Sequence, residues 1–152
     1  MIARTLFKSA LLFSTLLLLG VSGRAASSDV ILVTAAQNPI DELDAREVNS
    51  LYKGRLTTIK GIPLKPLNAP PGSIHRTKFL AQILKLDESG YTGYWHVRRY
   101  SGQGTPPAEI SDEKELFETL RLQPDRVGYL WTPAGKEIKL PEGLKIIRLK
   151  EK

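Results

Sequence analysis

The residues with the clearest ligand-binding chemistry lie in the segment 69–78, which reads Ala-Pro-Pro-Gly-Ser-Ile-His-Arg-Thr-Lys. A Pro/Gly turn leads there into the start of a predicted helix, where backbone N–H groups are free and the helix dipole favours negative charge. Gly72 permits a close backbone approach, and the hydroxyl of Ser73 can donate to an anion. His75 and Arg76 place cationic groups in the first helical turn, which the dipole disfavours unless an anion lies between them. The segment therefore predicts a site for a small oxyanion.

A purely structural interpretation of the same residues stays open. Ser73 also suits an ordinary helix N-cap, and Arg76 suits a solvated surface position.

The sequence has no paired acid and base at a recognisable spacing, so we expect a protein that is not an enzyme. The two histidines, His75 and His96, lack an acidic cluster and the chain has no cysteine. We therefore predict neither a metal site nor a cofactor.

The N-terminus changes what the charge implies. The chain has 152 residues and a formal net charge of +6, which at first suggests a polyanionic partner. Residues 1–25 combine a basic start, an apolar stretch and small residues before a cleavage point, the pattern of a cleaved secretory signal. An uncleaved anchor is the alternative, although a bilayer span needs about 20 apolar residues. Without Arg4, Lys8 and Arg24, 19 basic residues face 16 acidic ones, so we expect residues 26–152 to form one exported, periplasmic domain that does not bind nucleic acid.

The predicted elements form a small α/β domain. The apolar, β-branched run 29–34 predicts a buried first strand. Asp44 followed by Glu47 is a capping-box pattern that opens a helix ending at Gly54. We expect helices to cover a small mixed sheet. The further elements predicted are a Pro-containing edge strand over 62–67, helices opened by Ser73, by Asp87 or Ser89, and by Asp112 with Glu115, and strands over 127–131 and 144–149.

Two weaker features lie on the helix that ends at Ser101 and Gly102. Tyr91, Tyr94 and Trp95 share one face of that helix, which favours core packing over a platform for ligand stacking. Residues 96–99, His-Val-Arg-Arg, predict a solvated face, with an anion-contacting patch as the alternative.

Four motifs, in the same order, resemble the phosphate-binding proteins of ABC importers. Residues 51–55, Leu-Tyr-Lys-Gly-Arg, resemble the family's Ile-Phe-Leu-Gly-Lys segment. Residues 72–79 stand where the family has its Ser-Gly-Thr phosphate loop and a helix with a Phe. Residues 95–104, with Trp95 and Gly-Gln-Gly, resemble the family's Trp and Gly-Lys-Gly elements, and residues 126–130 resemble its Gly-Ala-Ile-Gly-Tyr-Val strand.

The resemblance implies one lobe of a type II periplasmic binding protein, because two lobes need about twice this length. It also implies that the protein recognises phosphate or another small oxyanion, in connection with ABC-type phosphate uptake. By analogy with ligands at strand ends, the end of the first strand would complete the wall of the site. The competing expectation is a ligand-free interaction module that binds an envelope receptor, a sensor kinase or a transporter subunit. The oxyanion-binding residues expected are Gly72, Ser73, His75, Arg76, Thr34 and Ala35.

Overall fold

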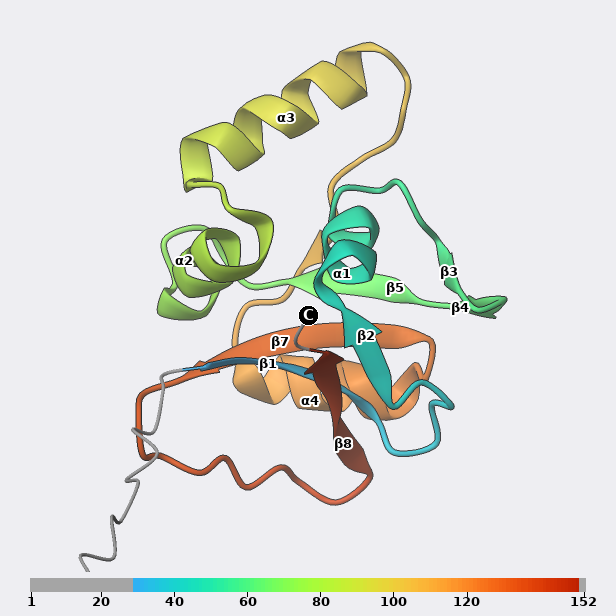
Figure 1. Ribbon diagram of the computed structural model, residues 1–152, viewed down its shortest axis with the longest axis vertical. Coiled ribbons are helices and arrows are strands. Elements are labelled where there is room, and N and C mark those ends of the chain that lie inside the picture. Colours follow the sequence, from blue (N-terminus) through green and yellow to red (C-terminus); the bar gives the residue numbers. More distant parts are fainter. Residues whose placement is uncertain (1–28, 151–152) are drawn as a thin grey trace, which may run out of the picture.

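The computed structural model describes residues 29–150, and the predicted signal segment 1–25 lies outside them (Figure 1). A mixed six-stranded sheet has the strand order β2-β8-β1-β7-β5-β6, and a two-stranded ribbon, β3-β4, stands apart from it. No helix in this described range is long and apolar enough to cross a membrane. The strands are β1 (Asp29–Ala35), β2 (Glu42–Asp44), β3 (Thr58–Ile59), β4 (Ile62–Pro63), β5 (Lys65–Asn68), β6 (Ala108–Glu109), β7 (Arg126–Thr132) and β8 (Leu144–Lys150). The helices are α1 (Ala45–Tyr52), α2 (Ile74–Phe79), α3 (Glu88–Tyr100) and α4 (Glu113–Leu122), with a π-helical turn, η1 (Leu80–Leu84), directly after α2.

The middle of the sheet is built on β1, which runs antiparallel to both β7 and β8. Strand β5 is parallel to β7 and to β6, and β2 is parallel to β8. Because β1 has strands on both sides and helices on both faces, its sequence is an almost continuous apolar run. The mixed α/β sheet expected from the sequence is confirmed.

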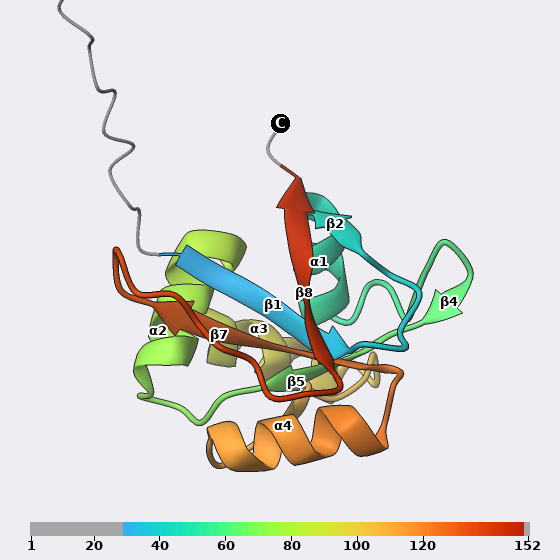
Figure 2. The same cartoon turned by 90° about the horizontal axis from the view of Figure 1, so that it is seen from below.

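The side chains of β1 alternate between two cores on opposite faces of the sheet. Leu32 belongs to the core under α1, α2 and α3, whereas Val33 belongs to the core under α4. Figure 2 shows α4 on one side of the strands and α1 and α2 on the other. This two-sided cover follows from the period of two along a strand, since successive residues point to opposite faces.

Local signals set the helix boundaries where the sequence predicts them. Asp44 caps α1 in a complete capping box with Glu47. Ser73 caps α2, and Asp87, not Ser89, caps α3. Each cap is a short-range contact between a side chain and the N–H groups of the first turn, so sequence spacing suffices to find it.

Two predicted elements differ from the structure. The expected strand over 62–67 is two strands, β4 and β5, broken between Pro63 and Lys65, because prolines cannot donate to a strand ladder. The expected helix after Ser73 changes at Leu80 into the wider turn η1, which ends at Lys85 with φ of 57°. The strands β2 and β6 were not predicted, since two or three residues carry no periodic signal.

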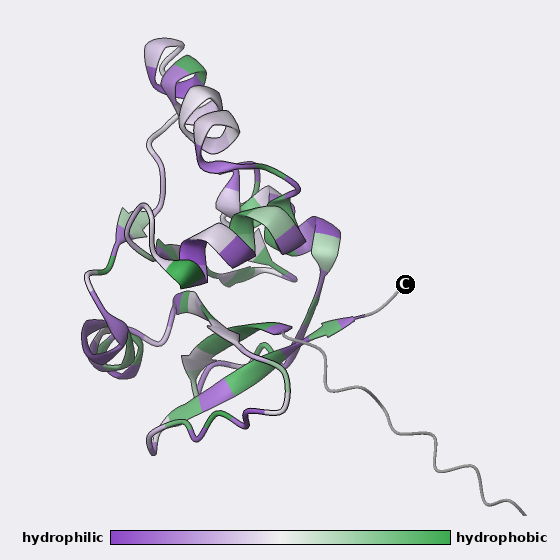
Figure 3. Cartoon of the chain, turned by 90° about the vertical axis from the view of Figure 1, so that its left-hand side faces the viewer, coloured by the Kyte–Doolittle hydropathy of each residue, from purple (hydrophilic) through white to green (hydrophobic). Residues whose placement is uncertain are grey.

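Helix α3 extends from the body of the domain (Figures 1 and 3). Only Tyr91 and Trp95 of this helix are buried, and its exposed side chains include Val97 and Tyr100. The core position expected for these two aromatic residues is confirmed, while Tyr94 is half-buried. The Trp95 ring packs so tightly on Gly54 that a Cβ there would lie 2.8 Å from it. This contact joins α3 to the end of α1.

Candidate functional site

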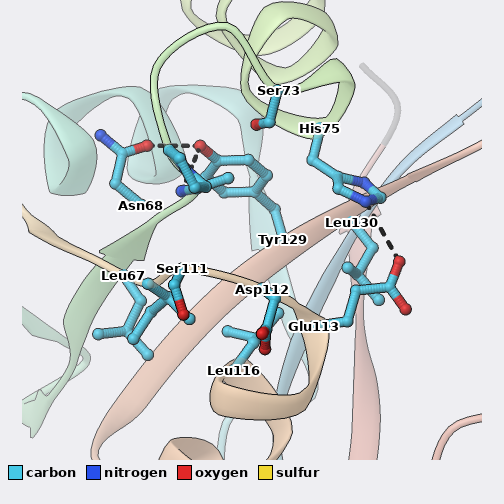
Figure 4. Close-up of a pocket in the computed structure, with 13 residues that line it drawn as sticks. Leu67, Asn68, Ser73, His75, Ser111, Asp112, Glu113, Leu116, Tyr129 and Leu130 are labelled. Atoms are coloured by element: carbon cyan, nitrogen blue, oxygen red, sulfur yellow. Dashed lines mark hydrogen bonds and ion pairs between the residues drawn. The ribbon is translucent and has the colours of Figure 1, made fainter.

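A pocket of about 280 Å³ lies where the starts of α2 and α4 approach the strands β5 and β7 (Figure 4). Its floor is mainly apolar and its rim carries hydroxyl, imidazole and carboxyl groups. Three stretches of the chain that are distant in the sequence, 67–75, 110–116 and 129–130, meet there. The residues that line it are Leu67, Asn68, Ala69, Pro70, Ser73, His75, Ile110, Ser111, Asp112, Glu113, Leu116, Tyr129 and Leu130.

A buried hydrogen-bonded network forms the polar part of the floor. The Tyr129 hydroxyl donates to Oδ1 of Asn68 and accepts from the backbone N–H of Ala69 at 3.0 Å. The Asn68 amide in turn donates to the Tyr91 hydroxyl at 3.0 Å. Burial raises the pKa of Tyr91 to about 12 and raises that of Tyr129 as well, so both phenols are neutral at physiological pH. The floor is thereby fixed in one arrangement.

Ser73 is the sequence-predicted site residue best placed to contact a solute. Its Oγ accepts the backbone N–H of Arg76 at 3.2 Å, which is the expected N-cap bond. Among the described residues, no acceptor is bound to its O–H, and the side chain lines the pocket. The cap therefore leaves one hydroxyl donor for a solute.

His75 also lines the pocket, but its ring is already held at both nitrogens. Nδ1 accepts the backbone N–H of Trp131 at 2.9 Å, so a neutral ring carries its proton on Nε2. Nε2 lies 3.2 Å from Oε1 of Glu113. The imidazole thus bridges α2, β7 and α4, and any donation to a solute would compete with this carboxylate.

Arg76 is buried, with 4% of its surface exposed, so the surface position considered for it is wrong. Its guanidinium forks onto Glu88, with Nε to Oε2 at 2.8 Å, and donates to Oε1 of Glu109 at 2.8 Å. It also donates to the carbonyl of Ala69 at 3.2 Å and lies over the Tyr91 ring, 5.2 Å from its centroid. Burial pulls the Arg76 pKa down, but the hydrogen bonds to the two carboxylates outweigh it and raise the pKa. Protein groups therefore engage this cation, and it does not line the pocket.

The other expected residues lie away from the pocket lining. Gly72 has φ of 81° in the turn before α2, a conformation that favours glycine. Thr34 is fully buried and its hydroxyl donates to the carbonyl of Arg126 at 2.7 Å, while Ala35 is also buried. The strand-end analogy assumes parallel strands, and β1 is antiparallel to β7. The end of β1 therefore lies near the start of β7, and a solute contact at Thr34 or Ala35 stays a prediction.

Sequence reasoning missed the acidic part of the rim. Asp112 caps α4 through the N–H of Glu115 at 2.8 Å, and Glu113 faces His75. The capping pair did locate the start of α4, but nothing local indicates that this start lies opposite Ser73. No group of three or more residues suited to hold a metal ion occurs in residues 29–150.

No protein-family model matches the sequence, and no curated protein matches it. Solved structures do match. An ABC-type phosphate transport receptor from Vibrio cholerae has a TM-score of 0.58 at 12% identity, over 82% of this chain and 48% of its own. A protein from Clostridium perfringens solved with bound phosphate, and assigned as a phosphate ABC transporter substrate-binding protein, has a TM-score of 0.58 at 14% identity, over 82% and 46%. A possible phosphate-binding protein from Planctomyces limnophilus has 0.53 at 9%, over 84% and 43%.

This chain spans less than half of the length of these neighbours. Sequence identities of 9 to 14% carry information on the fold alone. The structural likeness confirms the resemblance seen in the four sequence motifs: the chain has an α/β fold similar to one lobe of these binding proteins.

Proposed function

We propose that this chain is an exported solute-binding-like protein, made of residues 26–152 after removal of residues 1–25, that binds a small oxyanion such as phosphate. The proposed site is the pocket between α2 and α4. It is supported by one observation: Ser73 and His75, both expected from the sequence as site residues, line one small cavity together with Asp112 and Glu113. Similar folds occur in a phosphate transport receptor and in a protein solved with phosphate.

The rim favours an oxyanion that carries a proton. Ser73 can donate one hydrogen bond to an anion, and α4 directs its dipole and first N–H groups toward its start at the same pocket. The carboxylates of Asp112 and Glu113 repel a fully ionised anion but can accept a hydrogen bond from an O–H group. Phosphate retains such a proton near neutral pH, whereas sulfate does not, so we expect phosphate to bind in preference to sulfate.

In this proposal Arg76 acts as a positioning residue. Its hydrogen bonds to Ala69 and Glu109 fix the turn before α2 and the strand that leads to α4. The Ser73 hydroxyl and the start of α4 are thereby held on opposite sides of the cavity. Removing the guanidinium would loosen both walls without removing a ligand contact.

Isothermal calorimetry with phosphate, sulfate and acetate tests the proposal. We expect heat with phosphate, and Ser73→Ala should weaken binding about tenfold, since a hydrogen bond to a charged group contributes roughly 1.5–3 kcal/mol. Ser89→Ala is the matched control, because Ser89 is exposed on α3 and does not line the pocket. No heat with any of the three anions at millimolar concentration would overturn the proposal.

One observation favours a second candidate, a ligand-free module that binds a membrane protein of the envelope. The donors of His75 and Arg76 are already used by protein carboxylates, which leaves few for an anion. Cross-linking in an envelope extract would discriminate the two. Capture of the same membrane protein by the wild type and by Ser73→Ala, together with silent calorimetry, would favour this second candidate.

A further inference from the structure

A second cleft, of about 560 Å³, lies between α3 and the turn that follows α1. It shares no lining residue with the pocket of Figure 4. Lys53 and Arg55 line it from the turn, and Tyr94 and Arg98 line it from α3. We infer that this basic cleft is a binding site for a phosphate ester, separate from and independent of the oxyanion site proposed above.

The three cations of the cleft have no carboxylate to neutralise them. Within residues 29–150, seven ion pairs occur, and none of them involves Lys53, Arg55 or Arg98. The carboxylate of Asp87 lies next to one lining residue, Gly90, but it caps α3 through the N–H of Gly90 and does not itself line the cleft. Like charges that converge without counter-charges create a positive potential, which an anion would relieve.

Arg98 is held in place by groups that leave its charge intact. One terminal nitrogen donates to the carbonyls of Gln103 at 2.8 Å and Gly54 at 3.2 Å, both neutral acceptors. The guanidinium lies 5.8 Å from the Tyr94 ring centroid and 5.6 Å from that of Trp95, while its buried Nε has no hydrogen-bond partner. A guanidinium fixed in this way loses little freedom when it binds an oxyanion.

Gly93, on the wall of the cleft, has no packing reason to be glycine. Glycine is among the least favourable residues in a helix interior. A Cβ at Gly54 would clash with Trp95, and one at Gly90 would crowd the capping Asp87, so packing accounts for those two glycines. A Cβ at Gly93 would meet nothing within 4 Å. The open space there allows a ligand to approach the helix backbone closely.

The cleft also unites the motifs that the pocket does not use. Residues 51–55 provide its two turn cations, and residues 95–104 provide the Trp95 contact and the Gln103 carbonyl. Its walls are not only basic. The Tyr94 ring and the exposed Val97 side chain add an apolar surface beside the cations. A phosphate group with an organic substituent matches this combination better than inorganic phosphate does.

The test uses two phosphate esters on the same set of variants. Phenyl phosphate in calorimetry represents a soluble ester, and co-sedimentation with phosphatidylglycerol vesicles represents a lipid headgroup. Lys53→Gln and Arg55→Gln should each weaken binding about tenfold, because each removes a charge-assisted contact. Arg99→Gln is the matched control, since Arg99 lies on the same helix but not in the cleft, and it should have no effect.

The outcomes separate this proposal from the first one. Ser73→Ala should leave ester binding unchanged, and Arg55→Gln should leave phosphate binding at the pocket unchanged. Binding to the soluble ester alone or to vesicles alone would each support the site and identify the source of its ligand. Equal losses for Arg99→Gln and Arg55→Gln, or no binding in either assay, would overturn the inference.

Discussion

Replacing Arg76 by alanine should destabilise the domain by about 3 kcal/mol. The residue is 4% exposed, and its side chain makes hydrogen bonds to Glu88, Glu109 and Ala69. Removing one partner of a fully buried ion pair costs roughly 3–5 kcal/mol. The two carboxylates here are 42% and 53% exposed, so water can solvate them after the change and the lower end of that range applies.

Urea denaturation of the purified protein gives the free energy of unfolding that this prediction concerns. Arg76→Lys keeps the charge but loses the fork onto Glu88, so it should cost about half as much as alanine. Arg99→Ala is the control on the exposed surface of α3, and it should change stability by less than about 0.5 kcal/mol. An Arg76→Ala variant as stable as Arg99→Ala would show that the guanidinium is not the centre of a buried polar cluster.

Two glycines should respond in opposite ways to replacement by alanine. The raised pKa values of the buried tyrosines should make the domain lose stability at high pH. Gly128→Ala should destabilise by about 1–3 kcal/mol in urea denaturation, because the new Cβ would clash with the Leu116 side chain. Gly93→Ala should instead stabilise by about 0.5–1 kcal/mol, since a Cβ there meets nothing. A destabilised Gly93→Ala would refute the open space described beside α3. The pKa of Tyr91 is raised to about 12 from a usual value of 10.0, so its contribution to stability is complete below pH 10 and declines as the pH rises toward 12. Tyrosinate absorbance during alkaline titration should show that this step is absent in Tyr91→Phe.

The helix caps show what sequence reasoning predicts well. Asp44, Ser73, Asp87 and Asp112 each bond to N–H groups two or three residues ahead, so all the information lies in one short segment. The long strands β1, β7 and β8 were also predicted to within a residue or so, because β1 and β7 carry apolar runs and β8 is rich in Leu and Ile.

The surroundings of the site residues depend on contacts that are distant in sequence. Nothing near Arg76 indicates that Glu109, 33 residues on, would bind it. His75 likewise meets Trp131 and Glu113 only because β7 and α4 pack beside α2. The sequence locates the cap at Ser73 and the start of α2, but the partners of His75 and Arg76 required the tertiary structure.

The central claim, that the pocket between α2 and α4 binds a small oxyanion, is tested most directly by amide chemical-shift mapping with phosphate. Adding phosphate to the nitrogen-15-labelled protein should shift the backbone amides of Ser73, His75, Asp112 and Glu113, which surround the pocket. Sulfate should produce smaller shifts, and Ser73→Ala should reduce those caused by phosphate. An unchanged spectrum, or shifts confined to residues outside this pocket, would contradict the account.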